Sequence, residues 1–218
     1  MNILIHACLQ RNDYVYRHLI PSMLAQGIRE DEIHVWMDFG REGALHSTLN
    51  SFKAVGLLPG GTWHIGDDVV ISRDFAEQLR AHDDGIVCGF ANADFDAGMP
   101  PGIQPPSKSW YSFQCIRIPN AIAAEFVQWF WLTATKIPGQ YQDLIKANKY
   151  DDWFWREFLQ KNHEHDLTVL NLAPNVVDHI DYLIGGSVIT NTRPKLQYRS
   201  AYWEDESIVE ELKEKLNK

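Results

Sequence analysis

The chain has 218 residues, a length that predicts one domain, or one domain with a small lobe. Hydrophobic residues make up 45% of it, which is enough for a sizeable core. The formal net charge of −9 disfavours broad nucleic-acid binding through bulk electrostatics, but it is compatible with a local basic groove.

The first ninety residues alternate between strand-like and helix-like patterns. An apolar run predicts a strand at residues 2–8, and the spacing of apolar residues predicts a helix at 13–26 that ends before Gly27. The alternation continues with strands at 32–38, 62–65 and 85–90 and helices at about 45–55 and 72–82. It predicts an α/β fold in which helices cover both faces of a Rossmann-like, mostly parallel central sheet.

The middle of the chain follows a different pattern. Residues 94–108 carry four prolines and two glycines, which predicts a long loop. We expect this loop to lie near the ligand-binding site, in a position suited to a lid. Strands are predicted at 110–118 and 167–172, and helices at 119–132 and after Tyr150. Residues 201–218 are predicted to form a charged amphipathic helix. No segment has the composition of an inter-domain linker, so residues 1–218 are predicted to form a single domain.

The cysteines and the N-terminus indicate the cellular compartment. Cys8, Cys88 and Cys115 are far apart and lack metal-ligand spacing, and the first two lie in apolar runs typical of buried thiols. The N-terminus has no basic segment followed by a long apolar stretch, and the longest apolar runs are well below the roughly 18 residues of a membrane span. We therefore expect a soluble, cytoplasmic protein without a signal peptide.

Two adjacent carboxylates, Asp67 and Asp68, follow the predicted strand at 62–65. Open α/β sheets bind ligands at the carboxyl ends of their strands, and carboxylate oxygens there suit a hard divalent cation that could hold a diphosphate. A solvated turn is the alternative for such a pair taken alone. Because no glycine-rich phosphate loop follows the first strand, a nucleotide's phosphates would need a metal or side chains, which Arg11 and the two aspartates could supply.

Four separated segments carry polar residues at or near predicted strand ends. They are Ile5-His6-Ala7-Cys8 with Arg11, Val35-Trp36-Met37-Asp38, Gly66-Asp67-Asp68-Val69, and Val177-Asp178-His179-Ile180 with Gly185 and Gly186. In this order they resemble the nucleotide-sugar-dependent glycosyltransferases of the GT-A fold, over about residues 2–190. Gly66 stands where that family often has an acidic residue, which leaves open which aspartate binds the metal and which contacts the ribose.

The resemblance implies a donor half at residues 1–93, an acceptor half at 94–200 with a C-terminal acceptor and metal-site segment, and a C-terminal helix at 201–218. The implied donor contacts are Arg11 beside the nucleotide, Asp38 near its base, Asp67, and the Gly185 and Gly186 pair, whose lack of Cβ atoms permits close approach to a diphosphate. The implied metal ligands are Asp68, Asp67 and His179. The implied cofactor is Mn²⁺ or Mg²⁺, and the implied donor is a nucleoside-diphosphate sugar, with UDP-sugars first.

The segment Tyr150-Asp151-Asp152-Trp153 resembles the acidic motif at a helix start that supplies the general base in inverting GT-A enzymes. Such a base must be a carboxylate within hydrogen-bond reach of the acceptor hydroxyl. We predict that Asp152 is the base and that Asp151 is a helix cap or an acceptor contact. Four aromatic residues are predicted to form either an acceptor wall or aromatic core: Trp110, Tyr111, Trp153 and Trp155.

The acceptor is predicted from resemblance alone. The chain is most similar to small phage-encoded glycosyltransferases associated with DNA hypermodification, which implies hydroxymethylated pyrimidines in DNA as the acceptor and the host cytoplasm as the location. The net charge of −9 argues against a DNA partner. A polysaccharide or lipid-linked acceptor is the alternative within the family. Outside it, a sugar nucleotidyltransferase and a binding module that keeps only nucleotide affinity are the other hypotheses.

Overall fold

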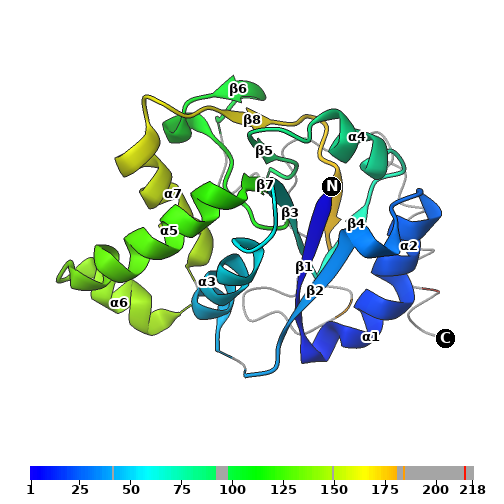
Figure 1. Cartoon of the computed structure of the whole chain (residues 1–218), viewed down its shortest axis with the longest axis horizontal. Coiled ribbons are helices and arrows are strands. Elements are labelled where there is room, and N and C mark those ends of the chain that lie inside the picture. Colours follow the sequence, from blue (N-terminus) through cyan, green and yellow to red (C-terminus); the bar gives the residue numbers. More distant parts are fainter. Residues whose placement is uncertain (41, 92–97, 149, 181–183, 185–213, 215–218) are drawn as a thin grey trace.

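The chain forms an α/β structure around one mostly parallel sheet (Figure 1). The computed structural model describes residues 1–40, 42–91, 98–148, 150–180, 184 and 214. Within these residues the sheet has seven strands in the order β2-β1-β3-β7-β5-β8-β6. They are β1 (Asn2–Cys8), β2 (Ile33–Asp38), β3 (Gly61–Gly66), β5 (Ile86–Cys88), β6 (Gly102–Gln104), β7 (Cys115–Pro119) and β8 (Val169–Asn171). Strand β1 is parallel to β2 and β3, and β5 is parallel to β8, so the prediction of a mostly parallel sheet is confirmed.

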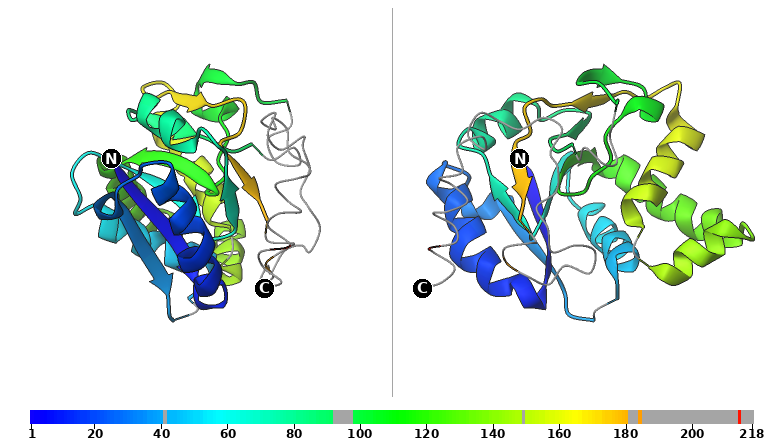
Figure 2. Two further views of the ribbon diagram at one scale, coloured as in Figure 1. Left: turned by 90° about the vertical axis from the view of Figure 1, so that its right-hand side faces the viewer. Right: turned by 180° about the vertical axis from the view of Figure 1, so that it is seen from behind.

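Helices cover both faces of the sheet, as the alternating pattern predicts (Figures 1 and 2). One face is covered by α3 (Ala44–Val55), α5 (Asn120–Leu132), α6 (Gln140–Ala147) and α7 (Asp151–His163). The other face is covered by α1 (Asn12–Tyr14), α2 (Ile20–Ala25) and α4 (Phe75–Ala81). A 3₁₀ turn (Leu9–Arg11) precedes α1 and a π turn (Val15–Leu19) joins α1 to α2, so the predicted helix at 13–26 is one helical segment that begins a few residues earlier.

A second, two-stranded sheet joins segments that are far apart in the sequence. Strand β4 (Val69–Ile71) is antiparallel to β9 (Val177–His179), and Val69 is the partner of His179. The two arrows lie side by side in both views of Figure 2. This pairing places His179 next to the turn that carries Asp67 and Asp68.

Two antiparallel strands depart from the predicted β-α alternation. Strand β7 lies between β3 and β5 and is antiparallel to both, so β5 is not a direct neighbour of β3. Strand β6 lies within the predicted loop at 94–108 and pairs with β8 at the sheet edge; its three residues are too few to give a periodic signal. The predicted strand at 110–118 begins only at Cys115. Of the lid predicted at 94–108, residues 94–97 lie outside the described residues, as does the C-terminal helix predicted at 201–218 apart from the helical Glu214.

Alternation along β1 and β3 divides polar from apolar side chains. Ile3, Ile5 and Ala7 are fully buried on the α1/α2/α4 face, because successive side chains of a strand point to opposite faces. His6 of β1 and His64 of β3 point to the α3 face, where they contact Ser47 and Phe52 respectively. The interior under α3 is therefore partly polar, whereas the interior under α4 is apolar.

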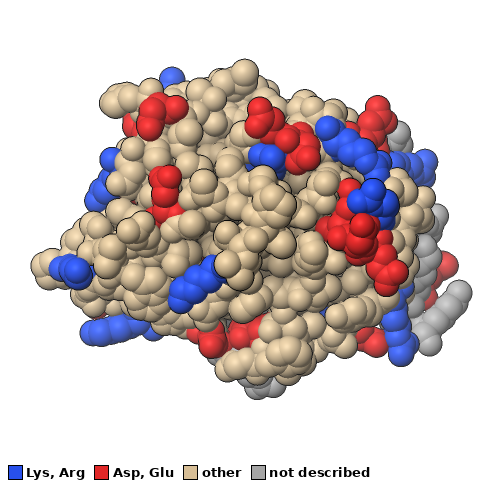
Figure 3. All heavy atoms as spheres, viewed as in Figure 1, with Lys and Arg blue, Asp and Glu red and all other residues tan. Residues whose placement is uncertain are grey.

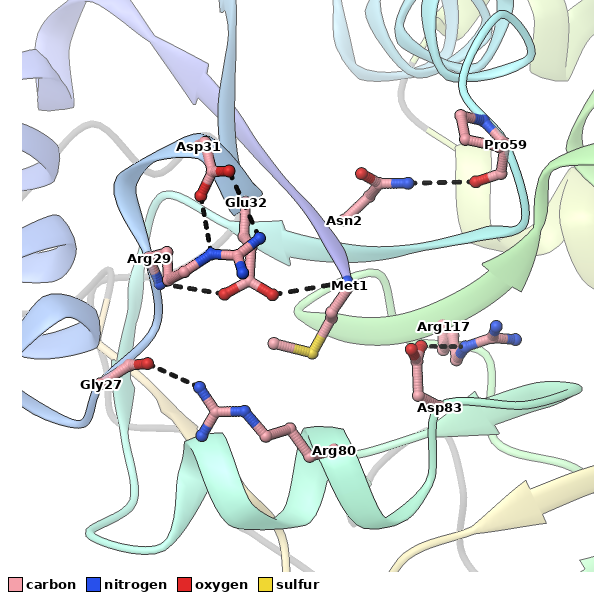
Figure 4. Close-up of polar contacts among 10 residues, drawn as sticks. All are labelled: Met1, Asn2, Gly27, Arg29, Asp31, Glu32, Pro59, Arg80, Asp83 and Arg117. Atoms are coloured by element: carbon pink, nitrogen blue, oxygen red, sulfur yellow. Dashed lines mark hydrogen bonds and ion pairs between the residues drawn. The ribbon is translucent and has the colours of Figure 1, made fainter.

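Polar contacts fasten the amino ends of the strands (Figure 4). The Met1 amino group lies 3.4 Å from Glu32, and the Asn2 amide donates to the Pro59 carbonyl at 3.1 Å. On β7, Arg117 pairs with Asp83 at 2.8 Å and also donates to the Gly85 carbonyl. With this end closed by internal contacts, the carboxyl ends of β1, β2 and β3 are the sheet edge at which polar side chains gather.

Burial of His64 makes the stability of the protein sensitive to acid. Burial, helped by the charge of His6, lowers the pKa of His64 from 6.5 to about 3. Between about pH 6.5 and about pH 3, His64 is therefore protonated in the unfolded chain but neutral in the folded chain. The free energy of unfolding is therefore at its full value above pH 6.5 and decreases as the pH falls from about 6.5 to about 3. At about pH 5 we expect a loss of about 2 kcal/mol in the free energy of unfolding from this residue. His64→Leu should remove that loss, which urea unfolding at about pH 7.5 and about pH 5 would measure. If the free energy of unfolding fell between these pH values as much in His64→Leu as in the wild type, the prediction would be wrong.

Candidate functional site

The candidate site begins at the carboxyl ends of three parallel strands. In the register of the sheet, Cys8 at the end of β1 is the partner of Asp38 at the end of β2, and His6 is the partner of Gly66 at the end of β3. Arg11 lies in the 3₁₀ turn directly after β1. The sheet therefore brings the ends of the three segments to one edge, where open α/β sheets bind ligands.

Arg11 makes a close ion pair with both aspartates. Its Nη1 lies 2.6 Å from Asp67 Oδ1 and 2.8 Å from Asp68 Oδ2. The other oxygen of Asp67 accepts a hydrogen bond of 2.7 Å from the Cys8 amide. The side chains of Arg11, Asp67 and Asp68 are 10%, 7% and 14% exposed, so water screens these charges weakly. The turn thus holds two carboxylates and one cation in a nearly dry environment.

His179 contacts the same group from the second sheet. Its Nε2 lies 3.0 Å from Asp68 Oδ2, the oxygen that also faces Arg11. The main chain supports this contact, since the Ile180 amide donates to the Asp68 carbonyl at 2.7 Å. The Tyr14 hydroxyl donates to the Val69 carbonyl at 2.6 Å and fixes the start of β4. Main-chain contacts therefore place His179 beside Asp68.

The surroundings shift the pKa values of Asp67 and Asp68 in opposite directions. Burial and the charge of Asp68 raise the pKa of Asp67, against the opposing effects of Arg11 and the Cys8 amide. Burial also disfavours ionisation of Asp68, but the hydrogen bond and charge of His179, with the charge of Arg11, outweigh it and lower the pKa of Asp68. Burial likewise opposes the charge of Arg11, but the two carboxylates raise its pKa. Asp68 is thus the aspartate whose charge the surroundings stabilise.

A second group of polar side chains lies under α3. His6 Nε2 and Ser47 Oγ are 2.6 Å apart, and the Thr48 hydroxyl donates to Asp151 Oδ2 at 2.7 Å. Burial lowers the pKa of His6. The negative charges of four aspartates oppose this effect, in decreasing order Asp151, Asp67, Asp38 and Asp68. His6 therefore stands in the combined field of the strand-end carboxylates and the carboxylate at the start of α7.

Asp38 lines a hollow on the other side of the strand ends. The hollow has a volume of about 580 Å³ and lies between β2 and α3. Its walls include the aromatic rings of Trp36 and Phe39 and the polar groups of Asn50 and Lys53. Asp38 Oδ1 accepts a hydrogen bond from the Glu42 amide at 3.2 Å, which fixes the carboxylate at the rim. A flat, partly polar ring could stack on these aromatic walls.

Asp68 and His179 carry two of the donor types that divalent cations use in proteins, a carboxylate and an imidazole. Within the described part of the chain, no group of three or more His, Cys, Asp and Glu side chains is arranged to hold a metal ion. The 3.0 Å between Asp68 Oδ2 and His179 Nε2 is the distance of a direct ion pair or hydrogen bond between the two side chains, and the same oxygen also faces Arg11. Mg²⁺ commonly takes one or two protein ligands and completes its shell with water and phosphate oxygens. With water and phosphate oxygens, these two side chains could supply two of the ligands of a cation that binds together with a phosphorylated ligand.

The structure brings together most of the residues that the sequence singles out. Arg11, Asp67, Asp68 and His179 form one contact group, Asp38 lies at the end of the neighbouring strand, and Asp151 lies near His6. Asp152 accepts a hydrogen bond from the Trp153 amide at 2.7 Å. The predicted diphosphate contacts Gly185 and Gly186 lie outside the described residues.

Sequence reasoning missed His6, Ser47 and Thr48 as members of this site. A signal was present for His6, which alternates with buried apolar residues of β1, but not for the two adjacent hydroxyls near the start of α3. The predicted aromatic residues are mostly core: Trp110 and Trp155 are fully buried and Tyr111 is 6% exposed. Trp153 is half-buried and packs edge-on against Tyr141. Three of the four aromatic residues are therefore not available as an acceptor wall.

The fold and the site define an α/β protein with a mostly parallel seven-stranded sheet, compatible with a Rossmann-like fold, and a polar group at the carboxyl ends of its strands. The chain matches no protein-family model and no curated protein sequence. Within the residues that the structure describes, none of the helices combines the length and the apolar character needed to cross a membrane.

Proposed function

We propose that the chain is a metal-dependent glycosyltransferase of the GT-A type that moves a sugar from a nucleoside diphosphate to an acceptor hydroxyl. One observation carries the proposal: Arg11, the adjacent Asp67 and Asp68, and His179 come from three segments far apart in the sequence and meet within hydrogen-bond distance at the carboxyl edge of the sheet. A cation beside carboxylates and an imidazole suits a ligand that carries both a metal ion and phosphate groups.

The donor would lie across the three strand ends. Its base would enter the hollow beside Asp38, where aromatic walls and a carboxylate meet. Asp68 and His179 would hold the cation, and Asp67 would contact the ribose or the cation. When bound, Mn²⁺ or Mg²⁺ neutralises charge that develops on the leaving nucleoside diphosphate. Arg11 would bind the diphosphate.

The transfer needs a carboxylate that accepts the proton of the attacking hydroxyl. The acceptor oxygen forms a bond to the anomeric carbon, the bond from that carbon to the phosphate oxygen breaks, and its electron pair leaves with the nucleoside diphosphate. A carboxylate in the first turn of α7 takes the acceptor proton and later releases it to water. A single displacement of this kind inverts the configuration at the anomeric carbon.

A hydroxymethylated pyrimidine in DNA is the acceptor to test first, on resemblance. A DNA enzyme would need a local basic surface, since the chain as a whole carries −9. On the face in Figure 3, the Lys and Arg side chains of the described residues stand among Asp and Glu rather than in a continuous band. Polysaccharide and lipid-linked acceptors therefore belong in the same experiment.

Release of nucleoside diphosphate from a panel of UDP- and GDP-sugars tests the proposal. Each donor is incubated with Mn²⁺ or with a chelator, and with hydroxymethylated DNA, unmodified DNA of the same sequence, a polysaccharide, a lipid-linked saccharide or no acceptor. We expect release from one donor that the chelator abolishes, and stimulation by hydroxymethylated DNA if that is the acceptor. Release of pyrophosphate from a nucleoside triphosphate and a sugar phosphate would instead indicate a nucleotidyltransferase. Binding of nucleotide without turnover of any donor would indicate a binding module and overturn the proposal.

A further inference from the structure

Two adjacent hydroxyls in the first turns of α3 connect β1 to the start of α7. Ser47 contacts His6 at 2.6 Å and Thr48 donates to Asp151 at 2.7 Å. Ser47 and Thr48 are 2% and 1% exposed, so neither hydroxyl has bulk water as an alternative partner. Burial of a hydroxyl is costly unless it is hydrogen-bonded, which makes each contact hard to exchange. Thr48 therefore holds Asp151 in a fixed place.

The turn before α7 is anchored to the same helix. Asn148 has a left-handed backbone, with φ of 52°, and its side-chain oxygen accepts the His46 amide of α3 at 3.0 Å. Its side-chain nitrogen donates to the Glu42 carbonyl. Gly43 lies so close that a Cβ there would stand 2.5 Å from the Asn148 side chain. This packing fixes where α7 begins, and with it the position of Asp151.

The two carboxylates of the first turn of α7 have different surroundings. Asp151 makes the largest charge contribution to the pKa of His6, ahead of the aspartates at the strand ends. Asp152 accepts the amide of the next residue, Trp153, a contact local to the helix start. Asp151 is therefore the carboxylate whose position is tied to α3, through the Thr48 hydroxyl at 2.7 Å.

We infer that Asp151 is the carboxylate that accepts the proton of the acceptor hydroxyl, and that Thr48 is the positioning residue that aims it. The inference rests on the proposed glycosyltransferase function and replaces Asp152 as the predicted base. The Thr48 hydroxyl can donate one hydrogen bond, and it donates it to Oδ2 of Asp151. In this role Thr48 would hold Oδ2 while Oδ1 would take the proton of the acceptor hydroxyl.

Steady-state kinetics of four variants test the inference. Asp151→Asn should lower kcat by about 10²- to 10⁴-fold, the usual contribution of a general base, with little change in the donor KM. Asp152→Asn should lose much less. Thr48→Val keeps the shape of the side chain but removes the donor and should lower kcat by roughly 10-fold, whereas Thr48→Ser restores the hydroxyl and should recover most of it. Thr135→Val, which deletes a hydroxyl bonded to the Trp131 carbonyl and not to a residue of the proposed site, is the matched control.

An NMR titration gives a readout that does not depend on turnover. Asp151→Asn removes a negative charge near His6 and should lower the pKa of His6 further, more than Asp152→Asn does, while Asp67, Asp38 and Asp68 still act on it. Equal losses of kcat in the two variants, or a larger loss in Asp152→Asn, would overturn the inference while wild-type turnover upheld the proposed function. Equal kcat in Thr48→Val and Thr48→Ser would remove Thr48 as a positioning residue. A wild-type protein without turnover would overturn both.

Discussion

Asp68→Asn should lower sugar transfer, measured as kcat/KM for the donor, by about 10³-fold while the protein stays folded. One oxygen of Asp68 lies 2.8 Å from Arg11 and 3.0 Å from His179, so it is the donor atom that a cation would share with the imidazole. An amide keeps the shape of the side chain but removes the charge. Hard divalent cations prefer charged oxygen ligands, so Mn²⁺ should bind much more weakly.

The fold should survive this substitution for two reasons. The Ile180 amide bonds to the main-chain carbonyl of Asp68, which the substitution does not alter. Arg11 keeps its contact of 2.6 Å with Asp67, so its charge is not left unpaired. Circular dichroism melting would check the fold, and electron paramagnetic resonance of free Mn²⁺ would check binding.

Asp83→Asn provides a matched control. Asp83 also pairs with an arginine, Arg117, but at the amino ends of the strands (Figure 4). This variant should keep wild-type transfer and Mn²⁺ affinity. Wild-type turnover in Asp68→Asn would remove the carboxylate from the mechanism, and an unfolded Asp68→Asn would show that its role is structural.

The element pattern of the fold could be predicted because it depends on local periodicity. Apolar runs define β1 and β3, and apolar spacing defines α3 and α5, in agreement with the structure. Neighbour order in a sheet depends on contacts between distant segments. Nothing in the run Cys115–Pro119 indicates that β7 lies antiparallel between β3 and β5.

The site could be predicted where strand ends carry it. Asp38 ends β2 and Asp67 follows β3, and both strands are parallel to β1, so the two aspartates lie at the same edge of the sheet. The contact of His179 with Asp68 depends on the pairing of β4 and β9, which have three residues each, too few for periodicity to reveal. Only the resemblance to GT-A enzymes predicted it.

The contacts under α3 could not be predicted from sequence. Whether Thr48 meets Asp151 depends on how α3 is rotated against β1 and on where the Asn148 turn starts α7. Adjacent hydroxyls in a helix are equally compatible with a solvated face. The structure resolves this point, because both hydroxyls are buried and face residues from other elements.

Arg11→Gln should raise the affinity for Mn²⁺ in the absence of nucleotide by roughly 10- to 100-fold, and should weaken nucleoside-diphosphate binding. In the structure, Nη1 of Arg11 lies 2.6 Å from Asp67 and 2.8 Å from Asp68, so the guanidinium neutralises the carboxylates that a cation would bind. Two unit charges about 4 Å apart interact by about 4 kcal/mol at an effective dielectric constant of about 20, and solvent reduces the measured effect.

The same substitution should make the protein depend on the metal for stability. Without Arg11, Asp67 and Asp68 are two nearly buried carboxylates that repel each other, and an uncompensated buried charge costs about 3–5 kcal/mol. Mn²⁺ should then raise the Tm of Arg11→Gln more than that of the wild type, because a ligand stabilises the folded state that binds it. Arg29→Gln, which removes an arginine paired with Asp31 on the surface, should respond as the wild type does.

The wild type should bind metal and nucleoside diphosphate cooperatively if Arg11 moves from the carboxylates to the diphosphate. Binding of the diphosphate would draw Arg11 away and free the carboxylates for Mn²⁺, and by linkage Mn²⁺ would favour diphosphate binding by the same factor. Calorimetric titration of each ligand with and without the other measures this coupling. Arg11→Gln should lose the part of the coupling that depends on the guanidinium. Equal coupling in the two proteins would show that Arg11 stays on the aspartates when the donor binds.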